Sequence, residues 1–439
     1  MKIVQAAGWY HPDSLGGTEI YVAALARHFR ACGHEVSVAA PDAASLEPRT
    51  YSHEGAEVFR YPIPSAPTRD EAQGEVPARG ADHFRRWLEQ RRPDVVHFHT
   101  FVTGLGLHEI RAARRLGARV IATTHASSLG FSCQRGTLMR DGMALCDGRV
   151  DVHRCAGCEL QHRGAPAPVR PLLAGIPPSI GRLMRGVPGP VGTALAMSDL
   201  IARNVHRQRA MLDEVDAFVV LTERAAEIVR ANGASAAKVV VNRLGINEPI
   251  TTAGRAADGD VIRVGYVGRF EEVKGVFDLA EAIRRLPRDL PLRVEFRGPA
   301  KSPAERAVKA ALVERLAGDD RVTFGEGVPP AEIYPLLRSF DVLCCPSRCL
   351  EGGPTVGLEA LAVGVPLIAA SAGGVAEVLD DGVNARLVPP GDVGTLVAAL
   401  TEVVRDPDAT IRRWGTRLPP PRTMRDVALD YLSLYAGTH

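Results

Sequence analysis

The chain has 439 residues, of which 46% are hydrophobic and 24% charged, and its formal net charge is +2. A single core stops growing at roughly 250–300 residues, so we expect two domains of an ordinary soluble, globular type. The small net charge argues against general nucleic-acid binding, and no apolar run of about 20 residues predicts a membrane-spanning helix. The first residues show no signal-peptide pattern, so we expect a cytoplasmic protein with reduced or metal-bound cysteines.

Short strand-like runs alternate with helical stretches in the first half of the chain. We expect strands at residues 2–7, 35–40, 94–100, 119–125, 216–222 and 238–242, and helices at 17–33 and 223–232. This alternation implies right-handed crossovers and a parallel sheet with helices on both faces. Two stretches break the pattern: residues 62–80, which we interpret as a surface loop, and residues 126–215, which are too long for one crossover.

The pattern restarts after a polar stretch at 251–260, which we predict to be a linker. The expected strands lie at 261–268, 292–298, 322–324, 341–347 and 366–371, and the expected helices at 275–286 and 357–364. We therefore expect an α/β protein with two doubly wound, Rossmann-like parallel-sheet domains, 1–250 and 261–417, facing each other across a cleft. Residues 418–439, a proline break and a helix, are expected to pack back on the first domain.

The loop HPDSLGGTEI follows the first strand and leads into a helix. Gly16 and Gly17 stand just before or at the helix N-terminus, where free backbone N–H groups suit a phosphate. The alternative is a simple glycine turn capped by Thr18. The pattern G-x-G-x-x-G is absent here and at the start of the second domain, which removes the main support for a dehydrogenase.

The loop GRFEEVKG follows the first strand of the second domain. Arg269 offers paired donors and Lys274 a point charge, and together they suit a diphosphate at the carboxyl edge of the sheet. The alternative is a pair of solvated surface cations.

The stretch CLEGGPTVGLE, Cys349 to Glu359, follows the strand DVLCC. Its glycines allow the backbone to approach a ligand closely, and the N–H groups from Thr355 to Gly357 are expected to form an anion cradle at a helix N-terminus. Glu359 falls in the first turn of that helix, where it either favours the helix dipole or accepts hydrogen bonds from a ribose diol. Glu351 is expected at the mouth of the cleft.

Glu351 and Glu359, separated by seven residues and followed by EALAVGVPLIAASAGGVAEVLDDGVNARLVPPGD, resemble the donor-site signature of the retaining family 4 glycosyltransferases, which have the GT-B fold. The segments GGTE, VHFHT, TTH and GRFEEVKG occur in the family's order. The resemblance covers nearly the whole chain apart from the details of 126–215. Many members carry an aromatic-Gly pair where this chain has Gly353 and Pro354, a departure that concerns sugar preference.

The resemblance implies a role for each matching residue. Glu351 and His125 would be catalytic, contacting the transferred sugar or the departing oxygen, and His99 lies where an acceptor would pass. The donor would be bound by Gly17, Arg269, Lys274, Val328, Glu351, Gly353, Thr355, Val356 and Glu359.

The implied reaction is retaining transfer of a hexose from a nucleoside diphosphate sugar to a sugar, lipid-linked or small-molecule acceptor. The implied mechanism is a same-face route. No catalytic metal is expected, because Arg269 and Lys274 would neutralise the leaving diphosphate. Such a protein would serve polysaccharide or glycoconjugate biosynthesis. The alternatives are a sugar-nucleotide epimerase on the same fold and an inactive, glycosyltransferase-like binding subunit.

Four cysteines cluster in a Gly-rich insertion at about 126–165. Cys133, Cys146, Cys155 and Cys158 include a C-x-x-C pair and could supply a tetrahedral set for a structural zinc ion, with His153 able to replace one ligand. The alternatives are four reduced thiols, two disulfides or an iron–sulfur cluster.

Two stretches, 83–92 and 177–190, combine cations with apolar residues. They are compatible with peripheral contact to anionic lipid on the inner face of a membrane, and equally with solvated helix faces.

Overall fold

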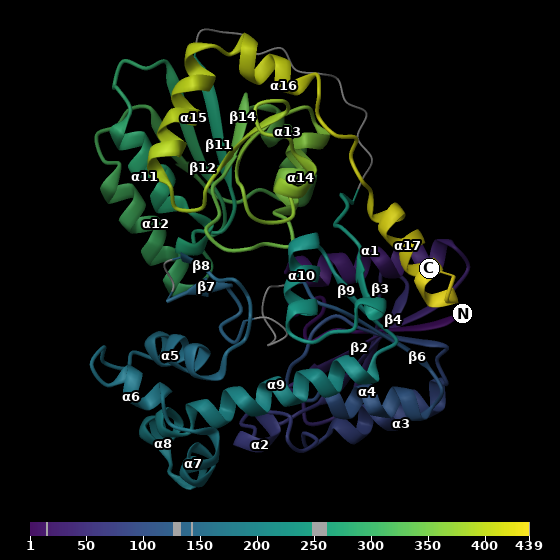
Figure 1. The fold of residues 1–439 in the computed structure, drawn as a ribbon. Helices are drawn as coiled ribbons and strands as arrows, with labels where there is room; N and C mark the ends of the chain where they lie inside the picture. Colours follow the sequence, from purple (N-terminus) through teal and green to yellow (C-terminus); the bar gives the residue numbers. More distant parts are fainter. Residues whose placement is uncertain (15, 126–132, 142–143, 248–260, 439) are drawn as a thin grey trace. The chain divides into compact units, whose positions relative to one another are not determined.

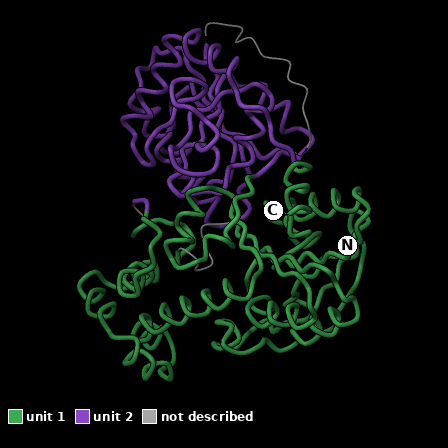
Figure 2. Tube along the Cα trace, turned by 45° about the vertical axis from the view of Figure 1, so that its right-hand side comes forward, with its two compact units in different colours: residues 1–142, 146–243, 424–439 green, residues 143–145, 244–423 purple. Residues whose placement is uncertain are grey.

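The structure is a computed structural model that describes residues 1–14, 16–125, 133–141, 144–247 and 261–438 (Figure 1). The chain divides into two compact units (Figure 2). Unit 1 comprises residues 1–142, 146–243 and 424–439, and unit 2 comprises residues 143–145 and 244–423. The predicted linker at 251–260 lies outside the described residues. No helix in the described ranges is both long and apolar enough to span a bilayer.

Unit 1 is built on an eight-stranded sheet with the order β10-β9-β6-β5-β1-β2-β4-β3. Its strands are β1 (Lys2–Ala6), β2 (Glu35–Asp42), β3 (Arg49–His53), β4 (Ala56–Pro62), β5 (Val95–Phe98), β6 (Arg119–Thr123), β9 (Ala217–Val220) and β10 (Val239–Val241). All neighbours are parallel except β3 and β4. The order changes direction between β1 and β5, which is where open α/β sheets bind ligands.

Helices cover this sheet, and a short strand, β7 (Met139–Arg140), lies outside it. The helices of unit 1 are α1 (Gly17–Ala31), α2 (Arg69–Ala72), α3 (Ala81–Arg91), α4 (Leu107–Arg115), α5 (Val152–His162), α6 (Arg170–Ala174), α7 (Pro178–Leu183), η1 (Met184–Gly186), α8 (Gly189–Leu195), α9 (Met197–Glu214), α10 (Glu223–Ala231), η2 (Ala236–Lys238) and α17 (Met424–Ala436). Residues 126–215 are therefore mainly helical where they are described, which explains their excess length over a single crossover.

The C-terminal helix α17 lies beside α1 in unit 1 (Figure 1). One face of α17 is buried, with Val427 and Tyr431 fully enclosed and Leu434 and Tyr435 nearly so. The hydroxyl of Tyr21 on α1 donates to that of Tyr431, at 3.1 Å. The last helix of the chain is thus part of the first sheet's covering layer.

Two local features of unit 1 differ from the sequence-based expectation. The hairpin β3–β4 extends the sheet by an antiparallel edge, and its turn places Glu54 and Gly55 at φ 48° and 76°. Residues 62–80, interpreted from sequence as a loop, contain α2, whose Thr68 and Glu71 form a reciprocal capping box. The prolines on both sides of α2 are typical of a loop, so this single helical turn was not recognised from the sequence.

Unit 2 contains a six-stranded parallel sheet with the order β13-β12-β11-β14-β15-β16. Its strands are β11 (Ile262–Val267), β12 (Leu292–Arg297), β13 (Val322–Gly325), β14 (Val342–Cys345), β15 (Leu367–Ala370) and β16 (Ala385–Val388), and β8 (Ala144–Leu145) lies outside it. The helices are η3 (Glu272–Lys274), α11 (Val276–Arg285), α12 (Pro303–Arg315), η4 (Pro330–Glu332), α13 (Ile333–Arg338), α14 (Thr355–Ala362), η5 (Ala376–Val378), α15 (Val393–Arg405), η6 (Asp408–Arg412) and α16 (Arg413–Gly415). The strand order changes direction between β11 and β14.

Candidate active site

An ion pair stands at the direction change of the unit 2 sheet. Lys274, after β11, places its Nζ 2.5 Å from Oε1 of Glu351, which follows β14. The strands are neighbours, with Val264 beside Val342, so the loops after them emerge together at the carboxyl edge. The two side chains are only 25% and 11% exposed, which shields the pair from solvent and salt. Two residues that are 77 positions apart are thereby joined where a ligand is expected.

The carboxylate of Glu351 is gathered by neighbouring donors. The hydroxyl of Ser347 donates to Oε1 at 2.8 Å, and the thiol of Cys349 lies 3.9 Å from the same oxygen. Burial, and then the Glu351 charge, raise the pKa of Cys349 to about 11, so this thiol stays protonated and serves as a weak donor. Among the described residues, every hydrogen bond to this carboxylate is made at Oε1.

Glycines fix the backbone around Glu351. Gly353 has φ 142°, which a side chain would strain. The loop after β15 holds the backbone of Glu351 in place, because the amide of Gly374 donates to the Glu351 carbonyl at 2.9 Å. A Cβ on Gly374 would lie 2.1 Å from the carbonyl oxygen of Gly352, so this close approach requires glycine.

Arg269 is less enclosed than Lys274. It follows β11, its side chain is 58% exposed, and its NH1 lies 2.7 Å from Oε1 of Glu271. Tyr266 donates to the Arg269 carbonyl at 2.7 Å and so holds the backbone rather than the guanidinium. Val328 follows β13 in a half-buried position near the same edge. Arg269 therefore keeps a solvent-accessible guanidinium, held by one acidic neighbour.

Helix α14 begins at Thr355, directly after Pro354. The amide of Gly357 donates to the Pro354 carbonyl at 2.9 Å, which leaves Thr355 and Val356 as the amides that precede the first intrahelical bond. The expectation that Gly357 joins an anion cradle is thus wrong, because its N–H is used inside the helix. Burial raises the pKa of Glu359, on the same helix, to about 7.

Gly17 is the first residue of α1 in unit 1, and Gly16 is its N-cap. Glu19 is buried beneath this turn, and the Ser14 hydroxyl donates to its Oε1 at 2.6 Å. A Cβ on Gly16 would lie 2.5 Å from the Glu19 carboxylate, whereas one on Gly17 would meet nothing within 4 Å. Gly16 is required by local packing, and Gly17 leaves open space at the helix N-terminus.

The structure brings His99 and His125 together at the carboxyl edge of the unit 1 sheet. Nδ1 of His99 lies 3.1 Å from Nε2 of His125, and Nε2 of His99 is hydrogen-bonded to Oε1 of Gln5. Burial lowers the pKa of His125 to about 4 and that of His99 well below its usual value. Both rings are therefore neutral at physiological pH.

The Gln5 amide fixes which nitrogens carry protons. Its oxygen can only accept, so Nε2 of His99 donates to it and Nδ1 of His99 is left as an acceptor. Nε2 of His125 must then donate to His99, and Nδ1 of His125 carries a lone pair. This assignment makes His125 a hydrogen-bond acceptor at Nδ1 rather than an acid.

The network continues into α17. Nδ1 of His97 lies 2.6 Å from the Tyr435 hydroxyl, and Nε2 of His97 lies 2.7 Å from Oγ1 of Thr123. The Gln5 amide nitrogen donates to Tyr435 at 3.4 Å. The C-terminal helix thus contacts Gln5, and Gln5 orients His99.

The predicted zinc site is not supported by the described residues. In the part of the chain that the structure describes, no three His, Cys, Asp or Glu side chains are grouped to hold a metal ion, and all eight cysteines are free thiols. Cys133 and Cys146 act electrostatically on the Cys155 thiol, so these three side chains lie in one neighbourhood without forming a metal-binding group in the described chain. Each has its own surroundings: Cys158 lies against the Met139 carbonyl and the Arg135 guanidinium, burial raises the pKa of Cys155 to about 11, and His153 bonds the Ala174 carbonyl.

Several site residues were not identified from the sequence. Ser347 and Gly374 contact Glu351, and Gln5 and Tyr435 connect the histidines. Gln5 carried a usable signal, since it is the one polar side chain in the apolar run IVQAA. Ser347 and Gly374 carried none, because only the folded loops bring them to the carboxylate.

Family models match both halves of the chain. The model described as "Glycosyl transferase 4-like domain" matches residues 16–245, and the model described as "Glycosyl transferases group 1" matches residues 251–417. The chain belongs to the glycosyl transferase 4-like family. Over its full length, this glycosyltransferase-family chain resembles two solved structures. One is sucrose-phosphate synthase from Thermosynechococcus elongatus, with a TM-score of 0.66, 18% identity and coverage of 100% of this chain and 99% of that chain. The other is Anabaena Alr3699/HepE in complex with UDP and glucose, with a TM-score of 0.64, 13% identity and coverage of 100% of both chains. These likenesses show the fold, which is the predicted GT-B fold with two parallel-sheet domains.

Among curated proteins, a D-inositol 3-phosphate glycosyltransferase from Kribbella flavida is 32% identical to this chain over 224 residues. That match covers 48% of this chain and 50% of the relative. The chain thus spans about half the length of the curated relatives it matches.

Proposed function

We propose that this protein transfers a hexose from a nucleoside diphosphate sugar to an acceptor hydroxyl, with retention of anomeric configuration. The observation that carries the proposal is the Lys274–Glu351 pair at the direction change of the unit 2 sheet, with Arg269 and the Thr355 and Val356 amides at the same edge. Two cations and free amides suit a diphosphate, and a carboxylate suits sugar hydroxyls. The UDP bound to the Anabaena neighbour supports this class of donor.

The charges suit departure of a diphosphate. As the bond between the anomeric carbon and the phosphate oxygen breaks, negative charge grows on the diphosphate, next to Lys274 and Arg269. The acceptor oxygen bonds to the anomeric carbon from the same face, and its proton passes to the departing phosphate oxygen. In this scheme the two cations neutralise the leaving group without a metal, and Glu351 interacts with the sugar as positive charge develops on the ring.

His125 contributes as a neutral hydrogen-bond acceptor. With Nε2 committed to His99, its Nδ1 can accept from a sugar hydroxyl and orient the ring. Glu359 accepts from the nucleotide ribose, and Gly17, Val328 and Gly353 allow backbone contact with the donor. An epimerase on the same fold would instead need a proton-abstracting group beside the sugar.

The test is donor turnover by the full chain with a panel of nucleoside diphosphate hexoses and acceptors, monitored by release of the nucleotide and by NMR of the anomeric proton. Glu351→Gln should lower kcat by about 100-fold or more, since it removes a group that acts on the transition state. Glu332→Gln, at an exposed position in the same unit, is the matched control.

The outcomes separate the candidate functions. Equal turnover by Glu351→Gln would exclude the proposed role of that residue. Interconversion of the donor sugar without an acceptor would identify an epimerase, and tight nucleotide binding with no turnover would identify a binding subunit.

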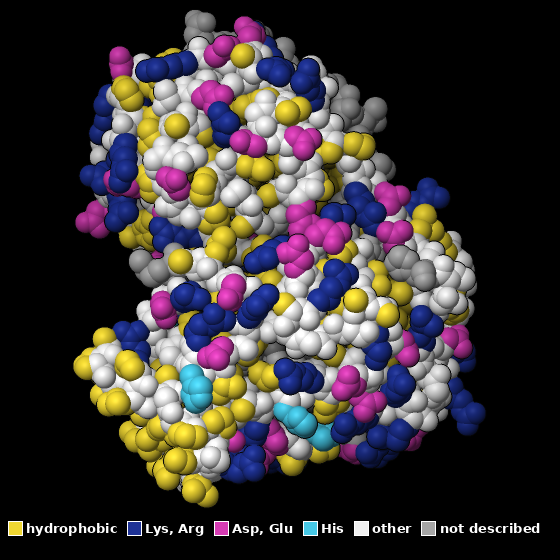
Figure 3. Space-filling model, viewed as in Figure 1, with side chains coloured by type: hydrophobic (Ala, Val, Ile, Leu, Met, Phe, Trp, Pro, Cys, Tyr) yellow, Lys and Arg dark blue, Asp and Glu magenta, His cyan; other side chains and the backbone are white. Residues whose placement is uncertain are grey.

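We also propose that unit 1 docks on an anionic membrane surface through an apolar patch on α6–α8. The patch consists of the exposed residues Val169, Leu172, Ile180, Leu183, Val187 and Val191, with Leu172 and Leu183 each 75% exposed. These residues gather over one region of the surface (Figure 3). The sequence from residue 160 to residue 198 contains four arginines and neither Asp nor Glu. Apolar side chains in a segment whose charged residues are all cationic favour an interfacial position on anionic lipid, which would suit a lipid-linked acceptor.

A further inference from the structure

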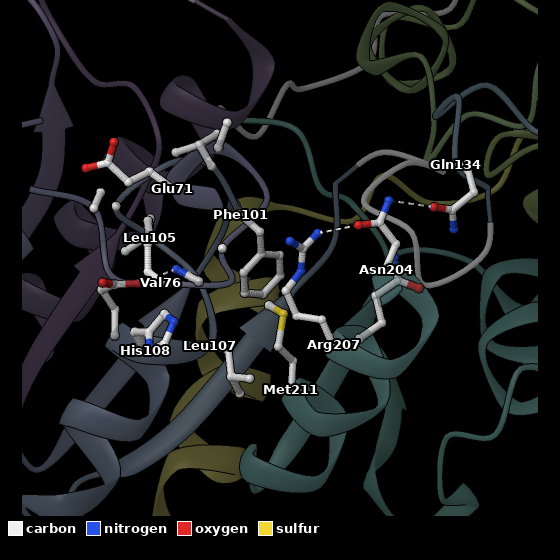
Figure 4. A pocket seen from close by; sticks show the side chains of 18 of the residues that line it. Glu71, Val76, Phe101, Leu105, Leu107, His108, Gln134, Asn204, Arg207 and Met211 are labelled. Atoms are coloured by element: carbon white, nitrogen blue, oxygen red, sulfur yellow. Dashed lines mark hydrogen bonds between the residues drawn. The ribbon is translucent and has the colours of Figure 1, made fainter. Parts of the chain in front are cut away.

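Unit 1 contains a cavity of about 320 Å³ that none of the proposed donor residues lines. Its walls come from three places: α2 and the residues after it, the loop between β5 and α4, and α9 together with residues 134–136. Figure 4 shows Arg207 of α9 at the centre, beside the Phe101 ring, with Asn204 and Gln134 beyond it. This volume suits a ligand about as large as a monosaccharide with one substituent.

The polar groups of the cavity are arranged as a chain that ends in donors. NH2 of Arg207 donates to Oδ1 of Asn204 at 2.9 Å, and Nδ2 of Asn204 donates to Oε1 of Gln134 at 3.1 Å. Both amide oxygens are thereby used within the protein. The Gln134 amide nitrogen is buried and has no hydrogen-bond partner among the described residues, and the same holds for Nε of Arg135.

Buried donors without partners are costly in proteins generally, so native structures retain few of them. Here they line one cavity with Arg207. Nε2 of His108, on the opposite wall, is also buried and without a partner in the described chain. The unmet groups are therefore mostly N–H donors, and the complementary ligand group must be rich in acceptors.

The acidic side chains of the cavity are already engaged. Glu71 accepts from Nε of Arg79 at 2.9 Å and from the Thr68 amide at 2.7 Å. Glu109 accepts from the Gly106 amide at 2.7 Å, and burial raises its pKa, which favours its neutral form. The charge available to a ligand is thus that of the Arg207 guanidinium. Arg135 adds its unpartnered Nε, since its NH1 and NH2 already contact Cys158 and His162.

The opposite part of the cavity is apolar. Phe101, Leu105, Leu107 and Met211 surround the space next to the guanidinium of Arg207 (Figure 4). Such a wall suits the carbon face of a ring. A ligand that satisfies the whole cavity combines an oxyanion with a compact ring.

One wall of the cavity is the loop that follows β5, at the edge of the sheet that carries His125. Strands β5 and β6 are parallel neighbours, with Phe98 beside Ala122, so Phe101 and His125 each stand three residues further along. Loops that follow adjacent parallel strands emerge at the same edge. A ligand held by Arg207 can therefore extend along this edge toward His125.

We propose that this cavity binds the acceptor by an oxyanion group, a phosphate or a carboxylate on a small ring compound, held by Arg207, Gln134 and Arg135. The inference rests on the proposed glycosyl transfer, and it adds that the acceptor is anionic. The ring would lie on the apolar wall, with a free hydroxyl directed to the donor.

The experiment is a titration of the full chain with inorganic phosphate, and separately with acetate, at constant ionic strength, followed by thermal unfolding. It is done in the Lys274→Gln background, so that phosphate binding at the proposed donor site does not contribute. Binding to the folded state raises the apparent unfolding temperature by mass action. We expect stabilisation with a half-maximal concentration in the millimolar range, and an about tenfold weaker effect in Arg207→Gln.

Arg209→Gln is the matched control, because Arg209 is exposed on the same helix and does not line the cavity. Gln134→Leu provides a second variant that keeps both arginines, and it should also weaken the effect. Stabilisation by phosphate alone identifies a phosphorylated acceptor, and stabilisation by acetate as well identifies a carboxylate-tolerant site. No stabilisation by either anion, or equal stabilisation of Arg207→Gln and Arg209→Gln, would overturn the proposal. These outcomes do not depend on turnover, so they are distinct from a failure of the proposed transfer.

Discussion

Glu351 and Glu359 lie in one short segment but have opposite surroundings. Three donors reach Oε1 of Glu351, one of them the Lys274 ammonium. Glu359 lies on α14 in a desolvated position that raises its pKa to about 7. One carboxylate is thus held by hydrogen bonds and an ion pair, while the other changes its charge near neutral pH.

The raised pKa of Glu359 leads to a pH-dependent affinity. Ribose hydroxyls donate to the ionised carboxylate, so nucleotide binding should strengthen as pH rises through about 7, by up to about tenfold between pH 6 and pH 8. Calorimetric titration with UDP at the two pH values measures it. The unliganded protein should show the opposite trend, because a raised acid pKa gives stability below pH 4.5 that is lost as pH rises toward 7.

Glu359→Gln is the control that isolates this carboxyl from the titration of the phosphate itself. The variant should bind UDP with a flatter pH profile in this range. An unchanged profile would show that Glu359 does not meet the ribose.

At the residue scale, sequence reasoning found charged groups but not their support. Lys274 and Glu351 were identified because each follows a strand and has a chemistry that suits the donor. Their direct pairing could not be predicted, because it depends on β11 and β14 being neighbours although β12 and β13 come between them in the chain. The cysteines show the converse: Cys133, Cys146 and Cys155 lie in one neighbourhood without forming a metal-binding group in the described chain, and Cys158 contacts the Met139 carbonyl and the Arg135 guanidinium instead.

At the scale of elements, α17 contributes buried polar contacts as well as apolar packing. Its Tyr435 hydroxyl meets His97 and Gln5 in a fully buried position. The helix itself was predicted from sequence, as were the central strands, because long buried runs give clear periodicity. The β3–β4 hairpin was not, since edge strands have one half-exposed partner and a weaker pattern.

Tyr435→Phe should destabilise the protein by about 1–3 kcal/mol, because it leaves Nδ1 of His97 and the Gln5 amide without this partner in the core. Urea-induced unfolding measures the change. Leu429→Ala, on the exposed side of the same helix, is the control and should cost far less. Equal losses for the two variants would show that the hydroxyl contributes no more than a surface contact.

A second effect of Tyr435→Phe is expected on turnover. Freed from Tyr435, the Gln5 amide can rotate, which would change the proton positions on His99 and His125. We expect a lower kcat with little change in donor KM. A proportionate change in both would indicate general loosening instead.

At the scale of the whole molecule, the apolar patch on α6–α8 gives a prediction for membrane binding. The protein should float with vesicles containing about 30% anionic lipid at low salt, and binding should weaken with salt. Replacing Leu172 and Leu183 with Ser should reduce the bound fraction about tenfold, since both side chains are 75% exposed.

Leu46→Ser is the matched control, because Leu46 is 93% exposed in unit 1 but lies between β2 and β3, in a part of the sequence remote from the patch. If the native protein does not float, or if Leu46→Ser behaves like the double variant, the patch is not a lipid-binding surface.

Helix α17, residues 424–436, belongs to the same unit as β1, although residues 244–423, which precede it in the chain, belong to the other unit. During synthesis, the rest of unit 1 is therefore translated before α17, which follows only after unit 2. The face that Tyr431 and Tyr435 will cover stays open until the second unit has been translated. A chain interrupted anywhere in that second unit would lack α17 and leave this apolar face exposed.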